Sequence, residues 1–101
     1  MNLTEQNLPL WQADAQGVAM VRSFVFADFK QAFAFMTGIA LHAEQHNHHP
    51  EWSNVYNRVE MRLTTHDTGG ITQKDITLAR YADQIAALLM AAAPVASHEK
   101  P

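Results

Sequence analysis

The first part of the chain has a pattern that is typical of a β-hairpin. Residues Val18 to Phe26 are rich in β-branched and aromatic side chains, and they follow the turn-forming stretch Asp14 to Gly17. A shorter strand over Leu10 to Ala13 is expected on the other side of this turn. These two strands would pair in antiparallel fashion.

A second pair of strands is predicted near the middle of the chain. Apolar and polar residues alternate from Val59 to Thr65, which is the period of a strand with one buried face. A shorter strand from Trp52 to Tyr56 should precede it, and the two are expected to join near Asn57 and Arg58. This gives a second antiparallel hairpin.

Between the two hairpins the apolar residues recur at spacings of three and four, which indicates a helix that ends at about His46. Asp28 with Gln31 resembles an N-cap and its reciprocal partner. Asn47 is expected to end the helix in a left-handed conformation, and Pro50 prevents its continuation. The positions expected to face the core are Phe29, Ala32, Phe33, Met36, Ala40 and Ala43.

The helical spacing returns in the last third of the chain. Thr72 with Asp75 favours a helix start, and we expect this helix to run from about Gln73 to about Ala92. Its predicted apolar side consists of Leu78, Ala82, Ile85 and Leu89. Residues 1–9 and 94–101 are expected to be loose termini of a single domain that spans residues 1–101.

The predicted order of elements is β-β-α-β-β-α. Such an order is typical of an α+β two-layer sandwich, in which a four-stranded antiparallel sheet carries helices on one face. A chain of 101 residues is large enough for one such domain and its single core.

Composition narrows the possible ligands. The chain has no cysteine, which excludes disulfides, thiolate zinc sites and a cysteine nucleophile. Seven Lys and Arg residues, unclustered in a chain of net charge -3, argue against a nucleic-acid partner and favour a small ligand. The apolar runs are too short to span a membrane, and the N-terminus does not resemble a signal peptide, so a cytoplasmic location is expected.

The stretch EQHNHHPEW holds three of the six histidines of the chain. His48 and His49 follow the end of the first helix, while His66 follows the last strand, whose antiparallel neighbour begins beside them. The three imidazoles can therefore meet. Because imidazole titrates near pH 6.5, such a group offers a proton donor and a proton acceptor together at neutral pH. Glu44 and Asp75 could orient these rings or hold N–H groups of a substrate.

Each of these residues also has an ordinary interpretation. A single histidine here is more often a solvated loop residue or a partner of the macrodipole at a helix C-terminus, and only the convergence of three favours catalysis. Trp52 is either part of the core or a wall for a flat heterocycle. His42 and His46 stand four residues apart on one helical face, a spacing that suits a metal ion, with His48 or Glu44 as a third ligand. We rank this metal site below proton transfer, since it would lack thiolates.

The motif E-x-x-x-HHP-E-W-x-x-V-Y, with a Thr-His pair after it, resembles the pterin-4a-carbinolamine dehydratase family from about Phe24 to Ala86. The resemblance implies the same antiparallel sheet with helices on one side. It also implies dehydration of 4a-hydroxytetrahydropterin to quinonoid dihydropterin and water, which needs no metal and no cofactor. The resemblance implies that this reaction is one step in the recycling of the tetrahydropterin of aromatic amino acid hydroxylases, which links the chain functionally to phenylalanine hydroxylase.

The resemblance also implies roles for individual residues. The catalytic histidines would be His48, His49 and His66, and the substrate-binding residues would be Glu44, Asn47, Trp52 and Asp75. Asn47 stands where animal members are associated with Asp, and Lys74 stands where Arg is expected. Both changes alter groups expected around the substrate.

Family resemblance further implies a homo-oligomer, either a dimer or a tetramer. Two other functions remain open. Animal relatives also act as dimerisation cofactors for a homeodomain transcription factor, so the chain could be a protein-binding or regulatory module. A pterin-related role in molybdopterin metabolism would suit the same pocket. Retention of all three histidines favours the enzyme.

Overall fold

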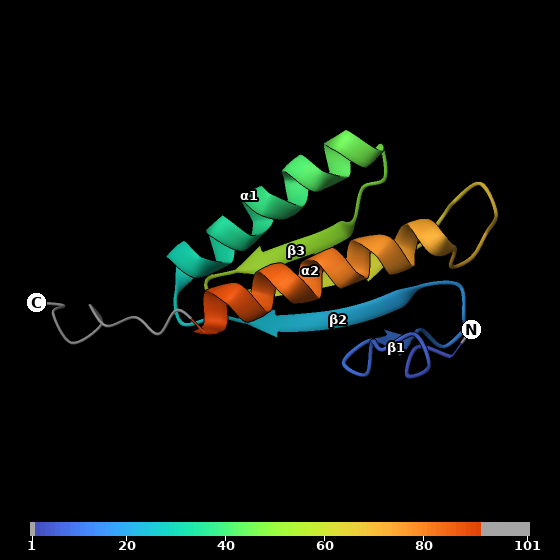
Figure 1. Cartoon of the computed structure of the whole chain (residues 1–101), viewed down its shortest axis with the longest axis horizontal. Helices are drawn as coiled ribbons and strands as arrows, with labels where there is room; N and C mark the ends of the chain where they lie inside the picture. The colour runs from blue at the N-terminus through green and yellow to red at the C-terminus, as the bar shows by residue number, and fades with distance from the viewer. Residues whose placement is uncertain (1, 92–101) are drawn as a thin grey trace, which may run out of the picture.

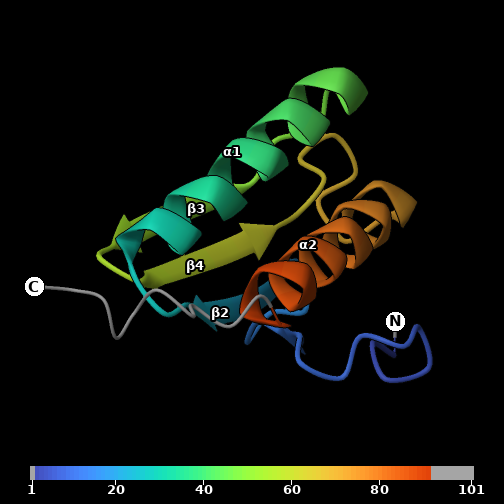
Figure 2. The ribbon, with the colours of Figure 1, turned by 60° about the vertical axis from the view of Figure 1, so that its left-hand side comes forward.

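The computed structural model describes residues 2–91 and contains the six predicted elements in the predicted order. They are β1 (Gln12–Ala13), β2 (Met20–Val25), α1 (Phe29–His46), β3 (Glu51–Val55), β4 (Arg58–Leu63) and α2 (Gln73–Ala91). Both helices lie on the same side of the strands (Figures 1 and 2). The α+β two-layer sandwich expected from the sequence is therefore confirmed.

The four strands form one antiparallel sheet in the order β1-β2-β4-β3. β2 and β4 pair along their whole lengths in the centre, and β3 pairs with β4 from Glu51↔Arg62 to Val55↔Arg58. Side chains alternate between the two faces of a strand. One face of the sheet therefore packs against the helices, and the other face is left open. Glu51, Val55, Arg58 and Arg62 all lie on the open face.

Aromatic rings fill the space between the sheet and α1. The ring of Phe35 lies 4.6 Å from that of Phe24 and 5.0 Å from that of Phe26, measured between centroids. Trp11 meets Phe24 edge-on at 5.9 Å, and its indole N–H donates a 2.8 Å hydrogen bond to Asp83 of α2. These contacts join both helices to the first hairpin.

The core-facing stripe of α1 differs from the predicted one. The buried residues of this helix are Ala32, Phe35, Ile39 and Ala43, whereas Phe29 and Phe33 are 47% and 57% exposed. Apolar residues surround most of α1, so more than one set of positions fits a spacing of three and four. Packing against the sheet selects the stripe that contains Phe35.

Two further expectations are corrected by the structure. The N-terminal segment is not loose over the described residues, because Leu3 and Leu8 are buried in the core and a 2.8 Å backbone hydrogen bond joins them. The turn of the second hairpin consists of Tyr56 and Asn57 instead of Asn57 and Arg58, and Tyr56 has a positive φ of 50°. The expected loose tail, residues 94–101, lies outside the described part of the chain.

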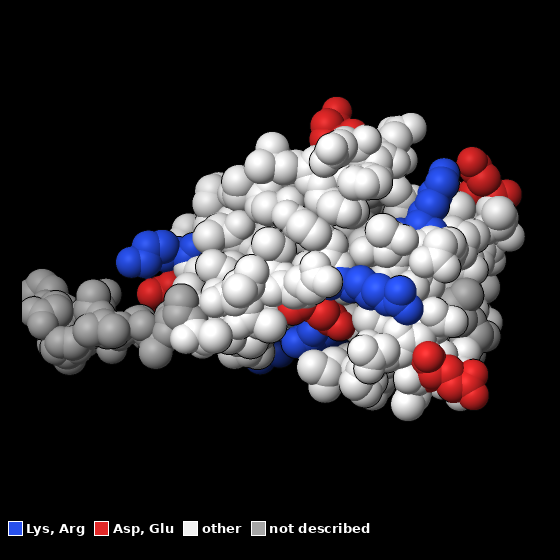
Figure 3. Space-filling view, viewed as in Figure 1, with Lys and Arg blue, Asp and Glu red and all other residues white. Residues whose placement is uncertain are grey.

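Charged side chains are dispersed over the surface shown in Figure 3, where Lys and Arg stand apart from one another and are interspersed with acidic residues. This face has no concentrated basic patch of the kind that phosphate backbones require. Within residues 2–91, neither helix is both long enough and apolar enough to cross a membrane.

Candidate active site

The end of α1 sets the direction of the first two histidines. Asn47 adopts the left-handed conformation, with φ 51° and ψ 44°, and the backbone N–H of His48 donates to the carbonyl oxygen of Ala43 at 3.0 Å. This closes the helix, and Pro50 then leads directly into β3. His48 and His49 are consequently held on a short corner between a helix and a strand.

A hollow of about 440 Å³ opens at this corner and brings the three predicted histidines together. It lies between the α1–β3 corner, the end of β4 and the start of α2. Its lining residues are Asn47, His48, His49, Pro50, Glu51, Thr64, Thr65, His66, Asp67 and Lys74. The convergence expected from the topology is thus present in the fold.

His48 is paired with a fully buried carboxylate. Its Nε2 lies 2.6 Å from Oδ1 of Asp75, whose side chain has no exposed surface. The other carboxylate oxygen, Oδ2, accepts hydrogen bonds from the hydroxyl of Thr65 (2.8 Å) and the backbone N–H of Thr72 (2.9 Å). A buried charge is costly unless it is hydrogen-bonded. Here Asp75 has three partners, which fix its orientation toward His48.

The same contacts explain why α2 begins where it does. Thr72 is the residue before the helix, and its hydroxyl accepts a hydrogen bond from the backbone N–H of Lys74 at 3.3 Å. Asp75 reaches back to the backbone N–H of Thr72, which completes a reciprocal capping arrangement. Asp75 therefore starts the helix and also orients His48.

The other two histidines have carboxylate partners that are more exposed. Nε2 of His49 lies 3.1 Å from Oε1 of Glu44, on the last turn of α1. Nε2 of His66 lies 3.0 Å from Oε2 of Glu51, the first residue of β3. The side chains of His49 and His66 are 55% and 79% exposed. Both are accessible to a ligand in the hollow.

The pairing assigns the two nitrogens of each ring. An ionised carboxylate accepts hydrogen bonds and has no proton to donate, so Nε2 carries the hydrogen in all three pairs. In the neutral ring Nδ1 then bears the lone pair, and in the protonated ring it can donate. Each imidazole can therefore gain or lose a proton at Nδ1 while a carboxylate holds its other nitrogen.

The remaining predicted site residues occupy different positions. Asn47 lines the hollow, whereas Glu44 and Asp75 act on it through His49 and His48. Trp52 is not among the lining residues; it is partly buried, packs against the core and also borders a groove on the open face.

Sequence reasoning missed Glu51 and Thr65 as partners of site residues. Glu51 stands inside the motif, next to Pro50, but its contact with His66 depends on the register between β3 and β4. Thr65 likewise reaches Asp75 only because the end of β4 meets the start of α2.

The geometry does not support the alternative metal site at His42 and His46. Their rings are stacked at 4.0 Å with an interplanar angle of 18°, and Tyr81 stacks on His42 at 4.3 Å. Burial lowers the pKa of His42, and the neighbouring His46 lowers it further. Residues 2–91 hold no group of three His, Asp or Glu side chains with a geometry suited to a metal ion. The two histidines form an aromatic stack.

Comparison with known proteins shows the family of the chain. The family model described as pterin 4 alpha carbinolamine dehydratase matches residues 1–85. The chain belongs to this family. It is 54% identical over 79 residues to a protein from Rhizorhabdus wittichii named "Putative pterin-4-alpha-carbinolamine dehydratase", covering 78% of this chain and 81% of that one. A protein of the same name from Rhodopseudomonas palustris is 56% identical over 84 residues, or 83% of each chain.

Solved structures give the same fold. A transcriptional coactivator/pterin dehydratase from Brucella melitensis superposes with a TM-score of 0.78 and 46% sequence identity, covering 83% of this chain and 92% of that chain. A pterin dehydratase-like protein identified as a RuBisCO assembly factor in the alpha-carboxysome has a TM-score of 0.66 at 19% identity, covering 75% of this chain and 88% of that one. The second comparison concerns the fold alone.

Proposed function

We propose that the protein dehydrates 4a-hydroxytetrahydropterin to quinonoid dihydropterin and water by general acid and base catalysis. The observation that carries this proposal is the meeting of His48, His49 and His66 in one hollow, each with its Nε2 held by a carboxylate. Membership of the dehydratase family supports it. In this proposal Asn47, Lys74 and the carboxylates around the rings contact the pterin or orient the histidines.

The reaction requires two proton transfers and no change of oxidation state. The C4a–O bond breaks as a proton is delivered to the departing hydroxyl group, which leaves as water. A proton leaves the adjacent nitrogen as the C=N double bond forms. One imidazolium and one neutral imidazole are sufficient for these steps, and His49 is proposed as a principal acid or base because it is accessible and oriented by Glu44. His48 and His66 share proton transfer or hold the pterin.

The proposal is tested by the decay of freshly generated 4a-hydroxytetrahydropterin, measured against the uncatalysed rate. We expect the wild type to accelerate this decay and His49→Ala to lower the catalysed rate by roughly 10²- to 10⁴-fold, the usual contribution of a positioned acid or base. Gln45→Ala, an exposed neighbour on α1, is the matched control. A wild-type protein that leaves the uncatalysed rate unchanged would refute the proposal.

The physiological setting is proposed to be recycling of the tetrahydropterin used by aromatic amino acid hydroxylases, with phenylalanine hydroxylase as the functional partner. A role in molybdopterin metabolism is the competing setting. A hydroxylase assay separates them when tetrahydropterin is limiting and an excess of reductant converts quinonoid dihydropterin back to tetrahydropterin. Under these conditions a recycling dehydratase should increase the sustained rate, and His49→Ala should not.

A regulatory role is the second candidate function. It is favoured by the similarity to the Brucella melitensis protein, which is described as a transcriptional coactivator as well as a pterin dehydratase. Protein binding by this chain would be insensitive to the imidazoles. A partner that is bound equally by wild type and His49→Ala, together with no dehydratase activity, would favour this candidate over the enzyme.

A further inference from the structure

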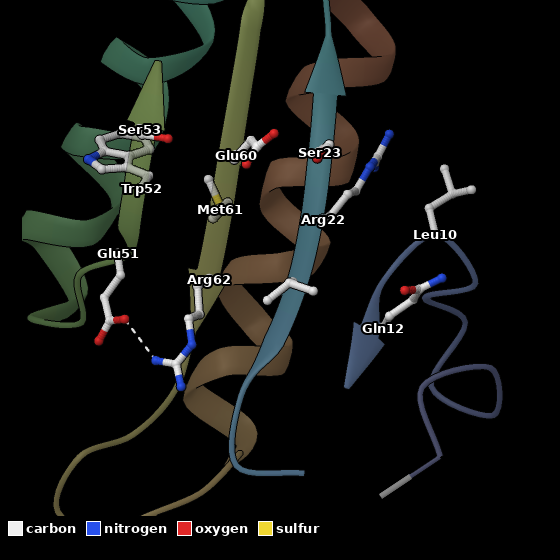
Figure 4. A pocket seen from close by; sticks show the side chains of 11 residues that line it. Leu10, Gln12, Arg22, Ser23, Glu51, Trp52, Ser53, Glu60, Met61 and Arg62 are labelled. Atoms are coloured by element: carbon white, nitrogen blue, oxygen red, sulfur yellow. Dashed lines mark hydrogen bonds and ion pairs between the residues drawn. The ribbon is translucent and has the colours of Figure 1, made fainter. Parts of the chain in front are cut away.

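A chain of ionic contacts crosses the open face of the sheet and ends at His66. The Nη2 of Arg62 donates to Oδ2 of Asp14 at 3.2 Å, and its Nη1 donates to Oε1 of Glu51 at 2.8 Å. The second oxygen of Glu51, Oε2, lies 3.0 Å from Nε2 of His66. Figure 4 shows Arg62 and Glu51 reaching toward each other from adjacent strands. Each carboxylate oxygen of Glu51 thus has its own partner.

The sheet register fixes this arrangement. Glu51 and Arg62 are directly paired between β3 and β4, so their side chains leave the same face at the same level. Asp14 is held from the other side, since its Oδ1 accepts hydrogen bonds from the backbone N–H groups of Val18 (2.9 Å) and Ala19 (3.3 Å). The guanidinium of Arg62 is therefore anchored at both ends.

The ionic contacts keep Asp14, Arg62 and Glu51 charged. The hydrogen bond from Arg62 is the main cause that lowers the pKa of Glu51, and burial opposes it only in part. Hydrogen bonds to Glu51 and Asp14 raise the pKa of Arg62 above its usual value. For Asp14, burial acts to raise the pKa, but the hydrogen bonds from Val18, Ala19 and Arg62 outweigh it. Glu51 remains an anion at neutral pH and accepts a hydrogen bond from Nε2–H of His66.

The side chain of His66 would have considerable conformational freedom without a partner. It is 79% exposed, on the loop between β4 and α2. An exposed imidazole without a partner samples several rotamers and both neutral tautomers. A fixed carboxylate at Nε2 selects one ring orientation and leaves Nδ1 for exchange with a ligand.

We propose that Glu51 is a positioning residue for His66, and that Arg62, anchored by Asp14, holds Glu51 in place. The effect of this positioning on catalysis rests on the proposed function. The positioning itself does not depend on turnover, so it can be tested separately. Arg62 and Asp14 would influence a proton transfer without contacting the substrate.

The first test reads the ring of His66 directly. In nitrogen-15 spectra of the histidine side chains, recorded where the imidazole is neutral, we expect wild-type His66 to show a single tautomer with hydrogen on Nε2. Glu51→Ala should show a mixture of tautomers. Glu60→Ala is the matched control, since Glu60 is exposed on the same face and pairs with Arg58 at 3.7 Å. An unchanged His66 spectrum in Glu51→Ala would overturn the proposal.

The second test is a double-mutant cycle in the dehydration assay. We expect Glu51→Ala to lower kcat by roughly 10-fold with little change in KM, the scale on which removal of a residue that orients a functional histidine acts. In the His66→Ala background the same change should have almost no further effect. An equal loss in both backgrounds would show that Glu51 acts elsewhere and overturn the proposal.

Arg62 offers a further comparison with a built-in control. Arg62→Gln should reproduce part of the loss seen for Glu51→Ala, whereas Arg58→Gln, on the same strand and face, should not. If His66→Ala itself leaves turnover unchanged, the catalytic role of His66 fails, and the ring spectra still decide whether Glu51 positions it. Thermal unfolding of every variant checks that the fold is retained.

Discussion

Asp75 has no exposed side-chain surface, and its Oδ1 lies 2.6 Å from Nε2 of His48. The pair joins the first turn of α2 to the residues that follow α1, across 27 positions of sequence. Because Thr65 and the backbone of Thr72 also donate to this carboxylate, one buried group connects both helices and the end of β4. The shape of the hollow and the stability of the fold therefore depend on the same residue.

Replacement of Asp75 by Asn is expected to destabilise the protein. The amide keeps the size of the carboxylate but places a donor where donors already converge, so at least one buried hydrogen bond is lost. The expected cost is roughly 1–3 kcal/mol in the free energy of unfolding. Urea denaturation measures it, with Asp67→Asn as the control because Asp67 is exposed. Equal unfolding midpoints for the two variants would contradict the role given to Asp75.

Stability should fall on mild acidification because of His42. Burial, with the nearby His46, lowers its pKa below the ordinary value of 6.5, so the unfolded chain takes up this proton first as the pH falls. The contribution is therefore present above about pH 6.5 and is lost as the pH falls through the lowered pKa. Urea midpoints at about pH 7.5 and 5.5 should differ more for the wild type than for His42→Phe, which keeps a ring beside Tyr81.

The carboxylates act in a separate pH range. Glu51 and Asp14 also have lowered pKa values, but their ordinary values are 4.5 and 3.8, so their contributions are lost only at lower pH. The same acid sensitivity in wild type and His42→Phe between about pH 7.5 and 5.5 would contradict the assignment to His42.

Local sequence signals predicted the parts of the fold that depend on neighbouring residues. The expected N-cap of α1 is present, with the backbone N–H of Gln31 donating to Asp28 at 2.9 Å, and Asn47 ends the helix in the expected left-handed conformation. The alternation in β4 also predicted its buried face correctly. Each of these features involves side chains only a few residues apart.

Features that depend on distant residues were harder to predict. Burial of Leu3 and Leu8 requires the rest of the core to be in place. Packing against the sheet determines that the buried side of α1 is the one that contains Phe35. The three histidines were found because hairpin topology alone brings them together. The carboxylate partners show the same difference. Glu44 is only five residues from His49 in the sequence, whereas the contact of Glu51 with His66 requires the register of two strands.

We expect the protein to form a dimer or a tetramer. Phe29 and Phe33 are 47% and 57% exposed on α1 and lie 5.7 Å apart, an apolar pair that a second copy could cover. Phe33→Glu should therefore weaken assembly, whereas Gln45→Glu adds the same charge to an exposed polar position of α1 and should not. Sedimentation velocity at micromolar concentration measures this. A wild-type protein that sediments only as a monomer would contradict the expectation.

The last prediction separates the histidines proposed to be catalytic from the stacked ones. His66 lines the hollow, so His66→Ala should slow dehydration, by up to the roughly 10²- to 10⁴-fold that a positioned acid or base contributes. His42 stacks between His46 and Tyr81, so His42→Ala should leave the rate nearly unchanged although it lowers stability.

Exhaustive chelation should also leave the wild-type rate unchanged, because proton transfer between imidazoles and the pterin needs no metal. All three results are measured as the decay of 4a-hydroxytetrahydropterin above background. A different outcome would establish His42 and His46 as metal ligands and remove the basis for the proposed mechanism. In that outcome chelation abolishes the activity, zinc restores it, and the His42→Ala variant is inactive.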